Sequence, residues 1–232
     1  YQGTITIFEK DVDFGKEAIA KEFNASIIEK TITPNNFETA LAPHLNEKTF
    51  LLNLAVSVSS EALIKLAQQH DSLYLDTCIE PWEYVGNGDA ILTSNFRLRE
   101  SIKRFGANTK SGQSTAIIAH GANPGFISVL LKKALTDMAK INNIEFNAHH
   151  QHDWALLAET LGIRVIQISE RDTQVAATDR SEGHFMCTWS VDGLITECLQ
   201  PAEMGWGSHE HLLPEGSTLN TYALSMKEQG RE

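Results

Sequence analysis

The sequence predicts an α/β fold with a mainly parallel sheet, followed by a smaller α+β region. Strand-like and helical segments alternate as far as about residue 145, which is typical of parallel strands joined by crossover helices. The run TFLLNLAVS at residues 49–57 is almost entirely apolar, as in a strand buried on both faces. Beyond residue 145 one helical segment precedes two strand-like ones. We therefore expect domains over residues 1–145 and 146–232.

Strands are expected where β-branched, aromatic or continuously apolar residues gather. In the first domain they fall at residues 4–9, 49–57, 73–76 and 114–120. In the second domain they fall at residues 164–172 and 184–193.

Helices are expected where apolar residues recur at helical spacing behind a capping residue. Ser59 or Ser60 is a good N-cap, Pro43 breaks a short helix, and Pro124 suits the first turn of another. The expected helices span residues 15–25, 37–45, 59–70, 95–105, 123–140 and 153–162.

The charge balance argues against a nucleic-acid-binding protein. Of the 232 residues, 30 are acidic and 19 basic, for a formal charge of −11, whereas nucleic-acid binding normally needs a basic face. No run approaches the roughly 18 apolar residues of a membrane span, and no signal peptide opens the chain. The three cysteines show no CxxC spacing. We expect a reduced, cytoplasmic protein that does not bind membranes.

Polar residues cluster where the expected strands of the first domain end. Glu9 ends the first strand, and NLAVSVSS, DTCIEPW and HGANPG mark the ends of the next three. In open α/β sheets, ligands bind beyond the carboxyl ends of the strands. The four clusters therefore predict a binding site along one edge of the sheet.

The acid at the end of the first strand suits a dinucleotide. A carboxylate at this position hydrogen-bonds the ribose 2′-hydroxyl of NAD, although a solvated loop acid explains Glu9 equally well. The GxGxxG fingerprint is absent, and GNGDAI at residues 86–91 follows no strand and is interpreted as a turn. If the fold is of the Rossmann type, its first strand, phosphate loop and first helix are expected to precede Tyr1.

The second domain offers the chemistry of an ammonium site. Trp189, Glu170 and Glu197 could hold a cation between an aromatic face and two anions; the alternative is a core tryptophan with two surface acids. Asn123 is either a plain helix N-cap or a residue that orients an amine. The histidines of HHQH and HEH lack the spacing of a zinc site, so we expect no metal.

Several long strings in the sequence resemble a known family. NLAVSVSS, LDTCIEPW, AHGANPG, SERDTQ, TWSVDGLITE and LQPAEMGWG occur in the order found in bacterial homospermidine synthases, over about residues 1–216. That family belongs to the saccharopine dehydrogenase-like enzymes that bind NAD. The resemblance implies a homodimer that transfers an aminobutyl group between putrescine molecules through an imine, with hydride removed and returned by the same NAD.

The resemblance also implies roles for individual residues. Glu80 and Asn123 would be catalytic, beside the nicotinamide and the reacting amine. Trp189, Glu170 and Glu197 would bind the diamine. The cofactor-binding residues would be Glu9, Asn53, Ser57, Asp76 and Thr77. Trp82, beside Pro81, is interpreted as a packing residue.

Two alternatives remain open at the level of sequence. The family's proteins are longer, so a phosphate loop and later pocket segments are expected outside this chain, and a non-catalytic polyamine-binding remnant is possible. A saccharopine- or carboxynorspermidine-type reductase would instead need arginines for an α-carboxylate, and Arg97, Arg99 and Arg171 are available. The Glu–Trp–Glu set suits a diamine better.

Overall fold

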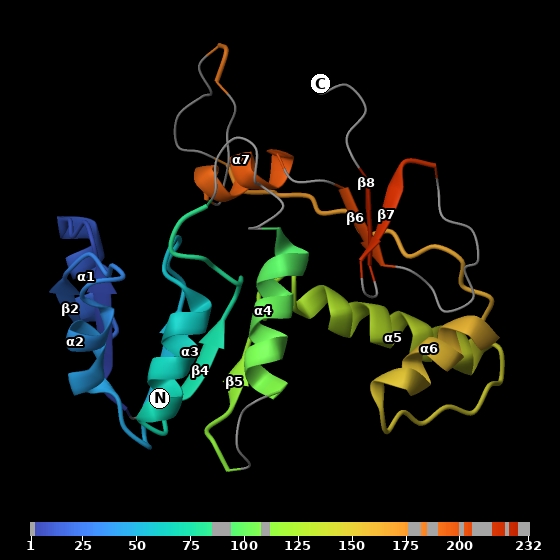
Figure 1. Cartoon of the computed structure of the whole chain (residues 1–232), viewed down its shortest axis with the longest axis horizontal. Coiled ribbons are helices and arrows are strands. Elements are labelled where there is room, and N and C mark those ends of the chain that lie inside the picture. The colour runs from blue at the N-terminus through green and yellow to red at the C-terminus, as the bar shows by residue number, and fades with distance from the viewer. Residues whose placement is uncertain are drawn as a thin grey trace. The chain divides into compact units, whose positions relative to one another are not determined.

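The computed structural model describes most of the chain, and its helices and strands are shown in Figure 1. The described residues are 3–84, 94–107, 112–175, 182–184, 190–199, 202–205, 215–220 and 223–226. They form two compact units. The first unit consists of Tyr1–Leu75, Ile79–Tyr84 and Leu98–Ala116, and the second of Asp76–Cys78, Val85–Arg97 and Ile117–Glu232.

The first unit opens with a βαβ motif. β1 (Ile5–Glu9) pairs in parallel with β2 (Ala25–Glu29), with Ile5 opposite Ala25. α1 (Phe14–Glu22) connects them, and it begins where the Asp13 side chain accepts a hydrogen bond from the Lys16 amide at 2.8 Å. A parallel pair requires such a crossover. The motif therefore confirms the expected α/β character.

β2 was not expected from the sequence. The helix predicted over residues 15–25 ends at Glu22, and Asn24 takes a positive φ of 52° before the chain enters the strand. Asparagine tolerates this left-handed conformation better than most residues. The short segment ASIIE then becomes a strand because β1 lies beside it.

The next helices and strands along the chain follow the predicted order. The elements are β3 (Phe50–Asn53), α3 (Ser60–Gln69), β4 (Leu73–Asp76), α4 (Asn95–Ala107) and β5 (Ala116–Ile117), and the strand order is β3-β4-β5. Ser59 caps α3 by accepting from the Ala62 amide at 3.3 Å. Of the apolar stripe predicted for α3, Leu63, Leu66 and Ala67 are buried and Ala62 is half-buried, and Ile64 is buried as well. β3 and β5 are shorter than expected.

The helix predicted near Pro43 is also confirmed. α2 (Phe37–Leu41) runs into a single 3₁₀ turn, η1 (Ala42–His44), which contains the proline. Proline cannot donate the backbone hydrogen bond that would continue an α-helix.

The second unit combines helices with an antiparallel sheet. α5 (Phe126–Ile141) and α6 (Gln151–Thr160) enclose a small core of Leu135, Ala139 and Leu157. α7 (Val191–Leu199) precedes β6 (Ala202–Gly205), β7 (Ser217–Asn220) and β8 (Ala223–Met226), which pair in the order β6-β8-β7. These elements supply the α+β character expected of this region.

Both strands predicted in the second domain need correction. Residues 163–175 run without strand pairing, and Val165, Ile166 and Ile168 are exposed. A strand needs a neighbouring strand to hydrogen-bond with, and none of the described strands pairs with this segment. In the other segment, residues 191–193 begin α7, while residues 185–189 lie outside the described part of the chain.

Across the described residues, no helix is both long and apolar enough to cross a membrane.

Candidate functional site

Two loops of the first unit meet at the Glu80 carboxylate. The chain after β3 brings the backbone amide of Ser57 to 3.0 Å from Glu80 Oε2, although 23 residues separate them in the sequence. The Tyr84 hydroxyl donates to the same oxygen at 2.8 Å. The structure thus joins two of the residues predicted for the site, Ser57 and Glu80, and adds Tyr84.

The backbone of Glu80 is tied to the first turn of α3. Its amide donates to the Ser60 hydroxyl at 3.0 Å, and its carbonyl accepts from the Ser60 amide at 2.9 Å. Ser60 is fully buried. Since buried polar groups are costly to leave unpaired, this exchange holds the loop after β4 against the start of α3.

Asn53 shapes the loop that presents Ser57. Its side chain is buried, with Nδ2 3.1 Å from the Val58 carbonyl and Oδ1 accepting from the Ala55 amide at 3.1 Å. Ser57 itself has a positive φ of 57°, which is uncommon for serine. The Asn53 amide therefore stabilises a turn whose backbone conformation is locally unfavourable.

Within the second unit, Asp76 anchors the chain after β5. Its side chain is fully buried, and Oδ1 accepts from the Ala119 amide at 2.6 Å. Its carbonyl accepts from the His120 amide at 2.9 Å. Ala119 has a positive φ of 51°, so these bonds hold a strained turn directly before the sequence GANPG.

The GANPG segment is a tight loop with little room at its glycines. A Cβ on Gly121 would lie 3.1 Å from the Thr77 carbonyl oxygen, and one on Gly125 would lie 2.5 Å from the Gly121 oxygen. Gly121 donates to the Pro124 carbonyl at 2.8 Å, and the Asn123–Pro124 peptide is cis. The backbone at Gly125 therefore leaves no room for a side chain, whereas a Cβ on Gly121 would fit only if its neighbours moved slightly.

Asn123 is exposed in this loop and does not cap the following helix. α5 begins at Phe126, with Gly125 at the N-cap position. The N-cap interpretation of Asn123 is therefore wrong, as is the expected start of the helix at residue 123. An exposed amide in a loop held by buried hydrogen bonds remains available to a ligand.

Glu9 lies where the sequence analysis placed it, at the carboxyl end of β1, but its carboxylate already has partners. The Asp11 amide donates to Oε1 at 3.2 Å, and Lys16 Nζ lies 3.3 Å from the same oxygen. These two interactions hold the pKa of Glu9 below its ordinary value. About a third of its side chain stays exposed.

The residues predicted to bind the diamine are not brought together by any described contact. Glu170 is exposed in the extended segment, Glu197 lies in α7, and Trp189 is outside the described residues. Trp82 is half-buried and packs on Phe37, with the ring centroids 5.3 Å apart, as expected for a packing residue.

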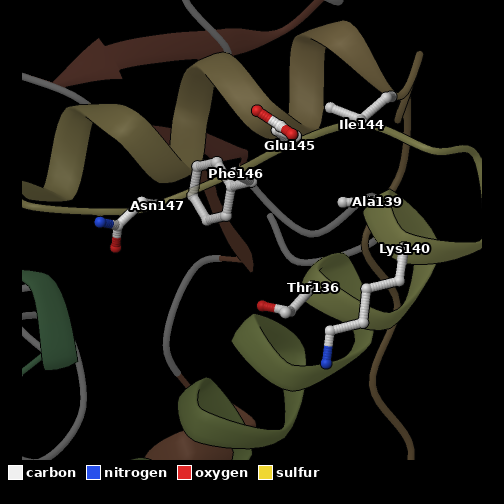
Figure 2. A pocket seen from close by; sticks show the side chains of 7 residues that line it. All are labelled: Thr136, Ala139, Lys140, Ile144, Glu145, Phe146 and Asn147. Atoms are coloured by element: carbon white, nitrogen blue, oxygen red, sulfur yellow. The ribbon is translucent and has the colours of Figure 1, made fainter.

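A hollow elsewhere in the second unit contains none of the predicted residues. It has a volume of about 660 Å³, and Figure 2 shows the side chains around it, which belong to Thr136, Ala139, Lys140, Ile144, Glu145, Phe146 and Asn147. Among the residues that the structure describes, no three His, Cys, Asp or Glu side chains gather in a way that could hold a metal ion.

Sequence reasoning missed two residues at the Glu80 cluster. Ser60 was considered only as a helix cap, and Tyr84 was not considered. The one signal for Tyr84 was its position four residues after Glu80 in EPWEY. That spacing does not indicate a contact in a loop, because the loop conformation decides whether the two side chains meet.

Curated relatives of this chain are homospermidine synthases. The protein from Mesorhizobium japonicum is 33% identical over 235 residues, which cover 92% of this chain and 48% of that protein. The protein from Blastochloris viridis is also 33% identical over 235 residues, covering 93% and 49%. The chain thus spans about half the length of the curated relatives it matches.

A solved structure has a fold similar to that of this chain. The crystal structure of the homospermidine synthase from Legionella pneumophila, in complex with NAD, superimposes with a TM-score of 0.79 at 37% identity. The match covers 95% of this chain and 47% of that one.

Two family models account for almost the whole sequence. The saccharopine dehydrogenase NADP binding domain matches residues 1–117, and the saccharopine dehydrogenase C-terminal domain matches residues 121–229. Together with the α/β architecture, these matches confirm the family expected from the sequence strings. The chain belongs to the saccharopine dehydrogenase-like family.

Proposed function

We propose that the full-length protein containing this chain is a homospermidine synthase. It would use NAD to transfer an aminobutyl group from one putrescine to another through an imine, with release of the donor's amine nitrogen as ammonia. The relatives that match 92% and 93% of the chain carry this name, and the Legionella pneumophila enzyme was solved with NAD. The protein would act in the cytoplasm as a homodimer.

The observation that carries the proposal is the cluster at Glu80. Ser57 and Glu80 follow β3 and β4, adjacent strands of one sheet, and share a hydrogen bond of 3.0 Å. Ligands of open α/β sheets bind beyond the carboxyl ends of the strands. A carboxylate held at this position suits a reaction on a cationic amine, because it can attract the ammonium group and accept a proton from it.

The described residues fit a dinucleotide in part. Glu9 stays about one-third exposed at the end of β1, where it can accept a hydrogen bond from a ribose hydroxyl if Lys16 shifts. Ser57 and Thr77 follow the carboxyl ends of β3 and β4, where the same rule would place a bound dinucleotide. The sequence holds no GxGxxG loop, so we assign the pyrophosphate to no residue of this chain. When bound, NAD would accept a hydride from the amine-bearing carbon and return it.

Asp76 and Asn53 would support the edge of the sheet where the cofactor would bind, without contacting the cofactor themselves. Both side chains are buried and hydrogen-bonded to loop backbone, so we propose that they support the loops that carry Ser57 and Asn123. Asn123, exposed in its loop, would orient the reacting amine. Trp189, Glu170 and Glu197 would hold the ammonium groups of the diamine through cation–π and ionic attraction.

The test is an assay of the purified full-length protein. With putrescine and catalytic NAD it should form homospermidine without net NADH production, because the hydride removed in the first step is returned in the last. A saccharopine-type reductase, which the family models also allow, would instead consume NADPH or NADH in the presence of an amino acid and a carbonyl compound. Our proposal would be refuted if the protein did not convert putrescine but did consume NADPH or NADH with an amino acid and a carbonyl compound.

A further inference from the structure

The Tyr84 hydroxyl lies at the centre of the Glu80 cluster without an assigned role. It donates to Glu80 Oε2 at 2.8 Å, and the Ser57 amide donates to the same oxygen at 3.0 Å. Tyr84 and Glu80 are both half-buried. Two hydrogen bonds to one oxygen of a carboxylate determine the direction in which the group points, since each has a preferred geometry.

We propose that Tyr84 is a positioning residue, which orients the Glu80 carboxylate for the reaction at the substrate amine. This inference rests on the function proposed above. The backbone of Glu80 is already tied to Ser60 by hydrogen bonds of 2.9 and 3.0 Å. Tyr84 therefore acts on the remaining freedom, which is the rotation of the Glu80 side chain.

The chemistry of the two donors supports this role. Hydrogen bonds to a carboxylate favour its charged form. Glu9 and Glu61 each form an ion pair with a lysine, which cancels much of the negative charge of the carboxylate. The Tyr84 hydroxyl and the Ser57 amide are neutral donors, so they can orient the Glu80 carboxylate without placing a positive charge on it.

Packing and hydrogen bonds anchor the two loops that meet at Glu80. Trp82, between Glu80 and Tyr84, packs on Phe37 with a centroid distance of 5.3 Å. Ser57 lies in the loop ordered by Asn53. The Ser57–Glu80 hydrogen bond thus joins two segments that are separately anchored, whereas the Tyr84–Glu80 hydrogen bond lies within one of them. Removing the hydroxyl should therefore release the carboxylate without unfolding the loop.

A double-mutant cycle in the full-length protein tests the proposal. Y84F removes only the hydroxyl, and it should lower kcat for homospermidine formation roughly 10- to 100-fold, as expected for loss of a hydrogen bond to a charged group, with little change in KM. E80Q should be impaired as well. If Tyr84 acts through the Glu80 carboxylate, adding Y84F to the E80Q variant should lower kcat little further.

W82F is the matched control, because it perturbs the same loop through packing. Its effect on kcat, whatever its size, should be the same in the parent and in E80Q. Additive effects of Y84F and E80Q, or a Y84F variant as active as the parent, would overturn the positioning role while leaving the proposed function intact.

Crystal structures of the parent and of Y84F provide a readout that does not depend on activity. In Y84F the Glu80 side chain should turn away from the Ser57 amide, while the Trp82–Phe37 packing stays in place. A Glu80 carboxylate that keeps its position without the hydroxyl would overturn the inference, even if the parent proved unable to form homospermidine and the proposed function failed.

Discussion

At the scale of single residues, buried hydrogen bonds place the candidate groups. Asp76 is fully buried and Glu80 half-buried, yet they are only four residues apart in the sequence. Asp76 holds the turn at Ala119, whereas Glu80 receives donors from Ser57 and Tyr84. Two acids of one short motif therefore differ in their surroundings: Asp76 supports a buried turn, and Glu80 is the acid that we propose for the chemistry.

Replacing Asp76 should test the structural role. In D76A the amide of Ala119 loses its acceptor, and unsatisfied groups of this kind cost about 1–3 kcal/mol of unfolding free energy. D76N keeps an oxygen in the same place and should lose less. Urea denaturation of the two variants measures the difference. Equal stability of D76A and the parent would show that the 2.6 Å contact contributes nothing.

Replacing Trp189 tests the proposed ammonium site. W189A should weaken putrescine binding by about 2- to 30-fold, since a cation–π contact is worth roughly 0.5–2 kcal/mol, and W189F should lose only part of that affinity. Calorimetric titration of putrescine into the full-length variants measures the effect. A W189A variant with a lower melting temperature but unchanged affinity would show that the indole only packs in the core.

At the scale of elements, caps and ion pairs decide where helices begin and how they associate. Asp153 illustrates the first case, because the amides of His149 and His150 donate to its carboxylate at the start of α6 and hold its pKa below the ordinary value. Glu61 illustrates the second, because it joins two helices of the first unit.

Glu61 should make the contact between α3 and α4 sensitive to acid. Its carboxylate pairs with Lys65 and accepts from the Ser101 hydroxyl of α4, and both interactions lower its pKa from the ordinary value of 4.5. The stabilisation is therefore fully present above pH 4.5, and it is lost as pH falls through the lowered pKa. Because the site is partly exposed, we expect at most about 1 kcal/mol.

The measurement compares E61Q with the parent by urea unfolding at pH 7 and again near pH 3. E61Q should be less stable at pH 7, and the difference should shrink at the lower pH, where the parent carboxylate is itself protonated. A difference that is equal at both pH values would assign the effect to packing rather than to charge. E100Q serves as a control, because it removes an ion pair with Lys103 that lies within α4 and does not join α4 to α3.

At the scale of the whole molecule, the parallel strands are divided into two sheets. One holds β1 and β2, and the other has the order β3-β4-β5. The Rossmann order 3-2-1-4-5-6 has a strand between positions 2 and 4, and the helix that follows this strand holds the pyrophosphate. Among the described strands, none pairs the sheet of β1 and β2 with the sheet of β3, β4 and β5.

Residues 1–232 expressed alone should therefore bind NAD weakly and form no homospermidine. The pyrophosphate contacts of a glycine-rich turn are charge-assisted hydrogen bonds worth about 1.5–3 kcal/mol each, and no such sequence occurs in this chain. Exposed strand edges should also favour aggregation or dimerisation. Calorimetric titration of NAD, with a homospermidine assay alongside, is the measurement. Micromolar binding together with product formation would contradict the Rossmann interpretation.

The sequence was sufficient for the α/β fold class and for part of the Glu80 cluster. Continuous apolar runs, helical spacing and caps such as Ser59 predicted most elements of the first unit, because these signals are local and each reports how a segment meets the core. The strand-end rule placed Ser57 and Glu80 along one edge before the 3.0 Å contact was seen. The long sequence strings identified the family, which the two family models confirm.

The tertiary structure alone decided which residues pair. β2 is a strand because β1 lies beside it, and residues 163–175 are not, because no neighbouring strand among the described residues pairs with them. The burial of Asp76 and the contact between Tyr84 and Glu80 likewise depend on loops that approach one another in space. Periodicity in a sequence records which side of a segment is apolar, whereas hydrogen bonds form between groups that only the folded chain brings within reach.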